Sequence, residues 1–192
     1  MPPTRLQQVL ALSLTLLYGA PALAVDHYNI DAKHTYPSFE IKHLGFSNQR
    51  GRFDKTTGKV TLDVAARTGS VELIIDARSI NMGFGDWDKH LQSEDFFWTE
   101  KYPTIEFKSE QLLFAGDKVV AADGLFTLHG VTKPLRLNVS DFVCGAHPML
   151  KKQVCGAEVT AIIKRSDFAM GKYLPALGDE VRLYSAIEAM HD

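Results

Sequence analysis

The feature that most constrains the fold is an alternation of apolar and polar residues with a period of two. The clearest run spans 181–190, where Val181, Leu183 and Ile187 alternate with Arg182 and Glu188. Successive side chains of a strand point to opposite faces of a sheet, so this pattern is typical of an antiparallel strand with one buried face. Similar runs cover 35–44, 47–54, 59–65, 70–77, 105–114, 119–128, 134–139 and 154–164. The sequence therefore predicts an all-β fold of eight or nine strands.

Turn signals divide these runs about every ten residues. Thr57-Gly58, Thr68-Gly69 and 115–118 are predicted to turn the chain, and Asp123-Gly124 indicates a bulge within a strand. Antiparallel strands of even length form either a sandwich or a closed barrel, and the alternation does not decide between them. A barrel of about eight strands has room for a filled core or for one ligand.

The stretch 79–103 interrupts the alternation and indicates a short helix. Gly83 and Gly85 flank Phe84 and would allow a flexible entry to it, Asp86 is a candidate N-cap, and Trp87, Leu91 and Trp98 are predicted to share one face. A helix this short is not stable alone in water, so we expect it to lie against an apolar surface. This insert between central strands favours a barrel that holds a ligand.

The N-terminal residues 1–24 have the pattern of a cleaved signal peptide. Arg5 precedes an uncharged run over 9–17, and Ala22-Leu23-Ala24 matches a cleavage site. The run is too short for a membrane anchor. We expect a single domain over 25–192, exported to the periplasm.

The two cysteines, Cys144 and Cys155, form an even pair in a chain expected to be exported, which predicts a disulfide. A redox or metal role is the alternative, but ten residues separate the pair, and His147 between them completes no ligand set.

Charge and motifs exclude several classes of function. The formal net charge is −2 and no concentrated basic run occurs, so nucleic acid is not an expected partner. The sequence contains no nucleophile elbow, zinc-protease motif, phosphate-binding loop or dinucleotide fingerprint. His90 and Glu94 have a spacing that would allow a shared metal, but a solvated helix face is the simpler interpretation. We expect no cofactor, no metal and no catalytic residues.

A set of motifs extends in order across the predicted domain: His34-x4-Phe39-x3-His43, Gly51-Arg52-Phe53, Asp88-Lys89-His90-Leu91-x-Ser93-x-Asp95-Phe96-Phe97, Tyr102-Pro103-x-Ile105-x-Phe107-x-Ser109, Gly124-x4-His129-Gly130-Val131-Thr132-Lys133-Pro134 and Arg165-Ser166-Asp167-Phe168. Together these resemble the YceI-like family of exported, lipocalin-like proteins associated with polyisoprenoid binding. The resemblance implies an eight-stranded antiparallel barrel with a helical segment, an elongated apolar pocket for an isoprenoid chain such as a quinone tail, and no catalysis. The chain departs from the family pattern at Ala169, where a glycine is expected.

Aromatic residues and inward strand positions are the candidate lining of this pocket, because each buried methylene contributes about 0.8 kcal/mol to binding. The candidates are Phe39, Ile41, Phe53, Leu73, Ile75, Phe84, Trp87, Leu91, Phe96, Phe97, Ile105, Phe107 and Leu183. Polar residues near predicted strand ends are candidates for headgroup binding: His43, Arg52, His90 and Arg165.

The expected partner is an isoprenoid lipid, most simply a quinone, and the sequence leaves open a homodimer and transient contact with membranes or membrane redox proteins. Two alternative functions remain at this point. One is an enzyme that uses His90 with Asp88 or Glu94, and the other is a stress-related protein whose barrel is filled.

Overall fold

The computed structural model describes residues 25–192, so the predicted signal peptide, 1–24, lies outside the described residues. The elements are β1 (Asp26–Ile30), β2 (Ser38–His43), β3 (Ser47–Phe53), β4 (Thr56–Asp63), β5 (Thr68–Asp76), the 3-10 helix η1 (Ala77–Ser79), β6 (Ile80–Asn81), α1 (Gly85–Gln92), β7 (Thr104–Ala115), β8 (Lys118–Leu128), β9 (Val131–Ala146), β10 (Gln153–Lys164), η2 (Arg165–Phe168) and β11 (Leu177–His191).

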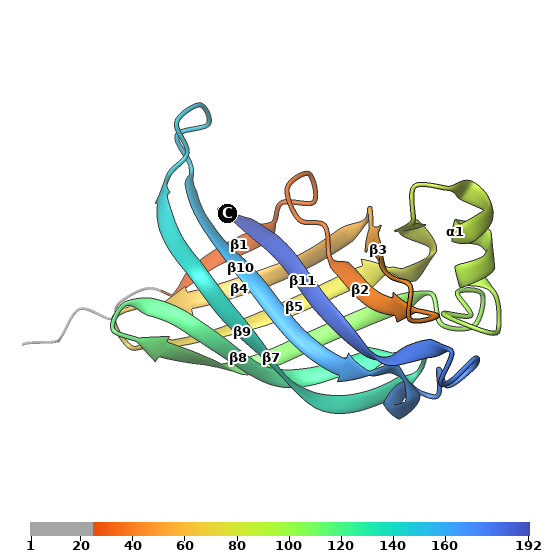
Figure 1. Cartoon of the computed structure of the whole chain (residues 1–192). Helices are drawn as coiled ribbons and strands as arrows, with labels where there is room; N and C mark the ends of the chain where they lie inside the picture. Colours follow the sequence, from red (N-terminus) through yellow and green to blue (C-terminus); the bar gives the residue numbers. More distant parts are fainter. Residues whose placement is uncertain (1–24) are drawn as a thin grey trace, which may run out of the picture.

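All the strands belong to one antiparallel sheet that closes into a barrel (Figure 1). The sheet order is β1-β4-β5-β7-β8-β9-β10-β11-β2-β3-β6, and β1 also pairs with β11. β1 and β2 both pair with β11, so they share one position in the barrel, one after the other along β11. In the same way, β3 and β4 share a second position and β5 and β6 share a third. The predicted eight-stranded antiparallel barrel with one short helix is therefore confirmed.

The closure differs between the two ends of the barrel. At the end that holds the N-terminus of β1, the ring of hydrogen-bonded strands is complete, from β1 through β4, β5 and β7 round to β11. At the end that holds α1, the last strand, β6, pairs with β3 alone among the described strands, and the segment that carries α1 connects it to β7 (Figure 1).

The interior is divided in the same way. A cluster of buried residues that includes Tyr28, Leu62 and Val119 fills the end that is fully hydrogen-bonded. A second and larger cluster, which includes Phe39, Phe107 and other residues, surrounds the interior at the α1 end.

The turns differ in detail from those predicted. Thr57-Gly58 lies inside β4 and Thr68-Gly69 begins β5, so the connection between these strands is 64–67. Gly58 has a different reason to be glycine: a Cβ there would lie 2.2 Å from the backbone oxygen of Glu72 on β5. The bulge predicted at Asp123-Gly124 is real, but the extra residue is on β7, between Lys108 and Gln111.

The cysteines form the predicted disulfide. Cys144 on β9 and Cys155 on β10 are directly paired across the two strands, with their Cα atoms 4.1 Å apart. The β9–β10 hairpin continues past them and projects away from the barrel (Figure 1). Met149 and Leu150 at its tip are exposed. The disulfide therefore ties the two strands together near the base of this projection.

Candidate functional site

A cavity of about 580 Å³ occupies the half of the barrel nearest α1. Its size is within the range of roughly 300–1,000 Å³ that is usual for ligand pockets. The walls are the inner faces of the strands, where the period of two turns every second side chain inward, and α1 contributes to the end. The lining contains no Asp, Glu, Lys or Cys residue among 25–192. It includes some polar residues, among them His43, His90 and Arg165, but the surface that it presents to the cavity is almost entirely hydrocarbon.

Twelve of the predicted apolar residues line this cavity. They are Phe39, Ile41, Phe53, Leu73, Ile75, Trp87, Leu91, Phe96, Phe97, Ile105, Phe107 and Leu183. Phe97 is central to the aromatic part of the wall: its ring centroid lies 6.1 Å from that of Phe39 and 5.5 Å from that of Phe53. These three rings come from the α1 segment, β2 and β3, so the insert is packed against the strands by its aromatic side chains. Direct contact of these residues with a ligand remains a prediction.

The helix presents Trp87, His90 and Leu91 to the cavity, at positions i, i+3 and i+4. Phe84, predicted to line the pocket, is not part of the lining: it is the N-cap residue, before the first helical residue, and it is 58% exposed. Trp98 does not share the helix face either: the helix ends at Gln92, and Trp98 packs edge-on against Tyr102, 5.8 Å away.

The cap of α1 also differs from the prediction. Phe84 is the N-cap residue and forms no side-chain capping bond, while Asp86 lies within the first turn. The carboxylate of Asp88 instead accepts a hydrogen bond from the backbone N–H of Met82, 2.6 Å away, which holds the entry to the helix.

Two of the predicted headgroup residues, His43 and His90, line the cavity at its α1 end. The His43 ring lies 6.2 Å from the ring of Trp87, and the His90 ring lies 4.9 Å from that of Phe96. Within residues 25–192, the ring nitrogens of both histidines form no hydrogen bond. They are therefore hydrogen-bonding groups that a ligand can use at this end of a mostly apolar lining.

Arg165 also lines the cavity, but its guanidinium is already committed to the backbone. It donates to the carbonyl oxygens of Gly178 (2.8 Å), Lys172 (2.8 Å), Leu177 (3.2 Å) and Met170. Burial lowers the pKa of Arg165, and the nearby Asp179 carboxylate opposes this shift. Because four of its five N–H groups are used, Arg165 holds the 165–178 connection in place.

Arg52 lies on the outer face of the barrel, outside the cavity lining. Its neighbours in β3, Gly51 and Phe53, are buried, so the period of two turns Arg52 outward. Its guanidinium lies 2.7 Å from the Asp54 carboxylate and 4.9 Å from the centre of the Tyr36 ring. This geometry makes Arg52 a surface contact rather than a cavity residue.

Comparison with known proteins gives the family. The YceI-like domain model matches residues 28–189. This chain belongs to the YceI-like family. A UPF0312 protein of Vibrio cholerae is 34% identical over 167 residues, covering 84% of this chain and 87% of that protein.

Two solved structures have the same fold. Burkholderia cenocepacia BcnA has a TM-score of 0.70 at 24% identity, covering 83% of this chain and 98% of that chain. A polyisoprenoid binding domain from Saccharophagus degradans, implicated in plant cell wall breakdown, has a TM-score of 0.62 at 16% identity, covering 88% and 100%. In this YceI-like chain, none of the helices within residues 25–192 has the length and hydropathy needed to span a membrane.

Several lining residues of this YceI-like barrel were not among the predicted site residues. Ala161 and Ile163 on β10 follow the same alternation as the other strands, so their inward direction was readable from the sequence. Met170 and Tyr173 come from the irregular connection before β11, and no periodic signal marks them. The Tyr173 ring stacks on Phe96 with 5.8 Å between centroids, which brings this connection against the α1 segment.

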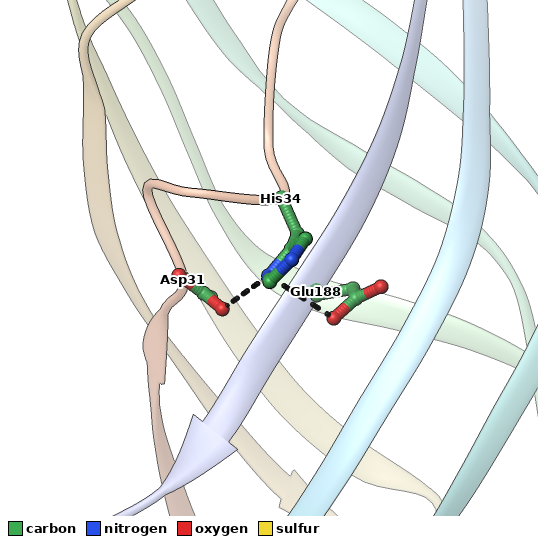
Figure 2. Close-up of side chains that lie close together, drawn as sticks. All are labelled: Asp31, His34 and Glu188. Carbon is green, nitrogen blue, oxygen red and sulfur yellow. Dashed lines mark hydrogen bonds and ion pairs between the residues drawn. The ribbon is translucent and has the colours of Figure 1, made fainter.

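A separate polar cluster lies outside the cavity, where the connection after β1 meets β11 (Figure 2). The Nδ1 atom of His34 lies 2.7 Å from an Asp31 carboxylate oxygen and 3.8 Å from one of Glu188. The hydrogen bond and charge of Asp31 raise the pKa of His34. Burial acts to raise the pKa of Asp31, but the hydrogen bonds from His34 and from the N–H of Lys33 outweigh it, and the pKa is lowered. One ligating atom from each of Asp31, His34 and Glu188 lies within 4.8 Å of the others, a spacing compatible with a divalent cation.

Proposed function

We propose that this protein binds the isoprenoid chain of a lipid, most simply an isoprenoid quinone, and stores or carries it in the periplasm without chemical change. The observation that carries this proposal is the cavity of about 580 Å³ lined by hydrocarbon side chains. A filled barrel does not fit that volume. The shared fold of the polyisoprenoid binding domain from Saccharophagus degradans supports the same class of ligand.

The physical argument rests on the match between the lining and a prenyl chain. Transfer of each CH₂ group from water into an apolar site contributes about 0.8 kcal/mol, so a single isoprene unit of about five carbons contributes about 4 kcal/mol. No polar contact is needed along the chain to reach high affinity. The long aromatic and aliphatic wall from Phe97 down to Leu73 supports a linear hydrocarbon rather than a compact polar substrate.

The headgroup is proposed to lie at the α1 end, between His43 and His90. A neutral imidazole has one N–H donor, and a quinone carbonyl is an acceptor, so each histidine can donate one hydrogen bond to the ring of the ligand. The Trp87 side chain, beside His43, offers an aromatic face for stacking. Arg165 and Arg52 are left out of this role because of the contacts described above.

A catalytic role for His90 has less support. General acid–base catalysis by a histidine ordinarily uses a partner that orients the imidazole, often a carboxylate. The cavity lining contains no carboxylate among the described residues, and Asp88 is bonded to the backbone N–H of Met82. A binding function needs only the shape and the apolar surface that are present.

The direct test is to extract the protein, purified without detergent from its periplasmic fraction, with organic solvent and to identify the extract by mass spectrometry. We expect a prenyl lipid in stoichiometric amount, and stripped protein should take up an added isoprenoid quinone. A protein that carries no lipid and takes up neither quinone nor a prenyl hydrocarbon would contradict the proposal.

The headgroup assignment has its own test. His43→Phe and His90→Phe keep the ring size but remove the donors, so each is expected to weaken quinone binding about three- to tenfold, the effect of one hydrogen bond. Binding of a prenyl hydrocarbon without a headgroup should not change. His27→Phe, at an exposed site on β1, is the matched control. Equal losses for quinone and hydrocarbon would mean that the histidines act through shape alone.

A further inference from the structure

Large apolar side chains gather on the surface at the α1 end of the barrel. They come from the β2–β3 turn, the start of α1 and the connection before β11, and we call them the mouth rim: Leu44, Phe46, Phe84, Trp87, Tyr173 and Leu174. Phe46 is the most exposed of them, with 90% of its surface accessible. The N–H of Leu44 donates to the carbonyl oxygen of Ala176, 3.0 Å away, so the first and third segments are in direct contact. Figure 1 shows these segments at the same end of the barrel as α1.

The mouth rim is continuous with the cavity. Leu44, Trp87 and Tyr173 line the cavity, yet each of them is more than one third exposed to solvent. The opposite end of the barrel is filled by the cluster around Tyr28, Leu62 and Val119. A ligand therefore enters and leaves past the rim residues.

The chemistry of the ligand indicates what the rim contacts. If the cavity holds a prenyl lipid, as proposed above, the lipid must leave a bilayer to reach it. Each methylene exposed to water on the way lowers the population of that state about fourfold, so an aqueous path is prohibitively slow for a long chain. A mouth in direct contact with the acyl-chain region avoids this exposure. Exposed Trp and Tyr beside apolar residues are also the side chains that favour the membrane interface.

The charges on and beside the rim, over residues 42–46, 82–103 and 169–176, favour a neutral bilayer over an acidic surface. Lysines and acidic residues are both present there and nearly balance: Lys42, Lys89, Lys101 and Lys172 against Asp86, Asp88, Glu94, Asp95 and Glu100. One of these pairs, Lys172 with Asp95, is already joined at 3.1 Å. There is no basic patch among these residues that would draw the rim to anionic lipid or to an acidic protein.

We propose that the mouth rim inserts into the surface of a lipid bilayer and that the ligand passes directly between the bilayer and the cavity. This inference rests on the proposed function. The driving force is the burial of the exposed apolar side chains, with Phe46 and Phe84 the deepest. Docking is expected on neutral lipids and in high salt, because charge contributes little to it.

The test uses the full mature chain and vesicles of phosphatidylcholine and phosphatidylethanolamine. Phe46→Ser combined with Phe84→Ser removes two rim side chains, neither of which lines the cavity, and serine is well suited to the N-cap position of Phe84. Vesicle flotation should show roughly 100-fold weaker binding, about tenfold for each phenylalanine. The matched control is Met149→Ser with Leu150→Ser, which removes exposed apolar surface from the projecting β9–β10 hairpin instead. It should bind as the unmodified protein does.

Quinone loading from two sources separates this inference from the proposed function. From detergent micelles, the unmodified protein and both double variants should load equally, whereas from vesicles the Phe46/Phe84 variant should load much more slowly. Equal loading from vesicles would overturn the rim proposal and leave the binding function intact. Failure of every form to load from either source would overturn both.

Two further outcomes would also overturn the rim proposal. One is vesicle binding that requires phosphatidylglycerol and disappears in high salt. The other is a dimer, seen by sedimentation, that the Phe46/Phe84 substitutions dissociate without changing vesicle binding, because the rim would then contact a second copy of the chain.

Discussion

Replacing Ala161 with tryptophan tests whether the barrel interior is open space for a ligand. Ala161 is only 4% exposed, lies on β10 opposite Leu183 of β11, and lines the cavity. A larger side chain in a packed core costs about 1–3 kcal/mol, because neighbouring side chains must leave their rotamers. In this position the indole has the cavity to enter. We therefore expect Ala161→Trp to fold normally.

Ala161→Trp should change ligand affinity strongly and stability only slightly, and this difference makes the test decisive. An indole that displaces one isoprene unit of about five carbons should weaken binding by about 4 kcal/mol, roughly 1,000-fold in Kd. The midpoint of thermal unfolding of the lipid-free protein should fall by less than about 4 °C, the change that about 1 kcal/mol produces in a domain of this size. Ala186→Trp, on an exposed position of the same sheet, controls for the presence of the ring.

The assay pairs calorimetry of the lipid-free protein with quinone titration monitored by native mass spectrometry. The reasoning would be refuted by the opposite pattern: a strongly destabilised Ala161→Trp variant that still binds quinone with unchanged affinity. That result would mean that the interior around Ala161 is packed and that the ligand binds elsewhere.

Three other predictions concern the frame of the barrel. The folded-state pKa of Asp31 is lowered and that of His34 is raised, so their contact stabilises the fold most between about pH 4 and 6.5. The contact weakens as the pH falls through the folded-state pKa of Asp31 or rises through that of His34. Asp31→Asn should flatten the pH dependence of stability measured by urea unfolding across this window, and an unchanged profile would count against the ion pair. Ala169 has a left-handed backbone with φ of 57°, so Ala169→Gly should raise stability by about 1 kcal/mol in the same assay; a loss of stability would show that its methyl group is needed. Replacing Cys144 and Cys155 with serine should lower the unfolding free energy by up to about 3 kcal/mol and increase amide exchange in the β9–β10 hairpin, while quinone binding, which depends on the other end of the barrel, should be retained.

The sequence predicted the longer strands and their inward faces well, because both follow from one local rule, but the short strands β1 and β6 were not among the predicted runs. In β11, Val181, Leu183 and Ile187 all face the interior, as the alternation requires. The number of barrel positions did not follow from this rule alone. It depends on β1 and β2 sharing one partner strand, a long-range pairing that no local pattern encodes.

The candidate site was harder to predict wherever the backbone is irregular. Phe84 follows Gly83, whose φ is 78°, and the direction of its side chain is set by that turn rather than by a period. Arg165 has the polarity expected of a headgroup residue, but its guanidinium binds carbonyl oxygens that only the folded 165–178 connection brings together. The sequence showed that Ala169 stands where the family pattern has glycine. The structure shows that the backbone at Ala169 is still left-handed, in spite of the added methyl group.

Among the described strands, β6 is paired on one side only, and this gives the barrel an asymmetric resistance to opening. Strands β7 to β10 are hydrogen-bonded on both sides, so separating any of them breaks two ladders at once. The flap formed by β2, β3, β6 and the α1 segment is joined to the rest by one ladder, between β2 and β11. The Leu44–Ala176 hydrogen bond, the Lys172–Asp95 ion pair and the stacking of Phe96 on Tyr173 add single contacts to it. We therefore expect outward movement of this flap to be the least costly way to widen the passage into the cavity, with β7 to β10 remaining in register.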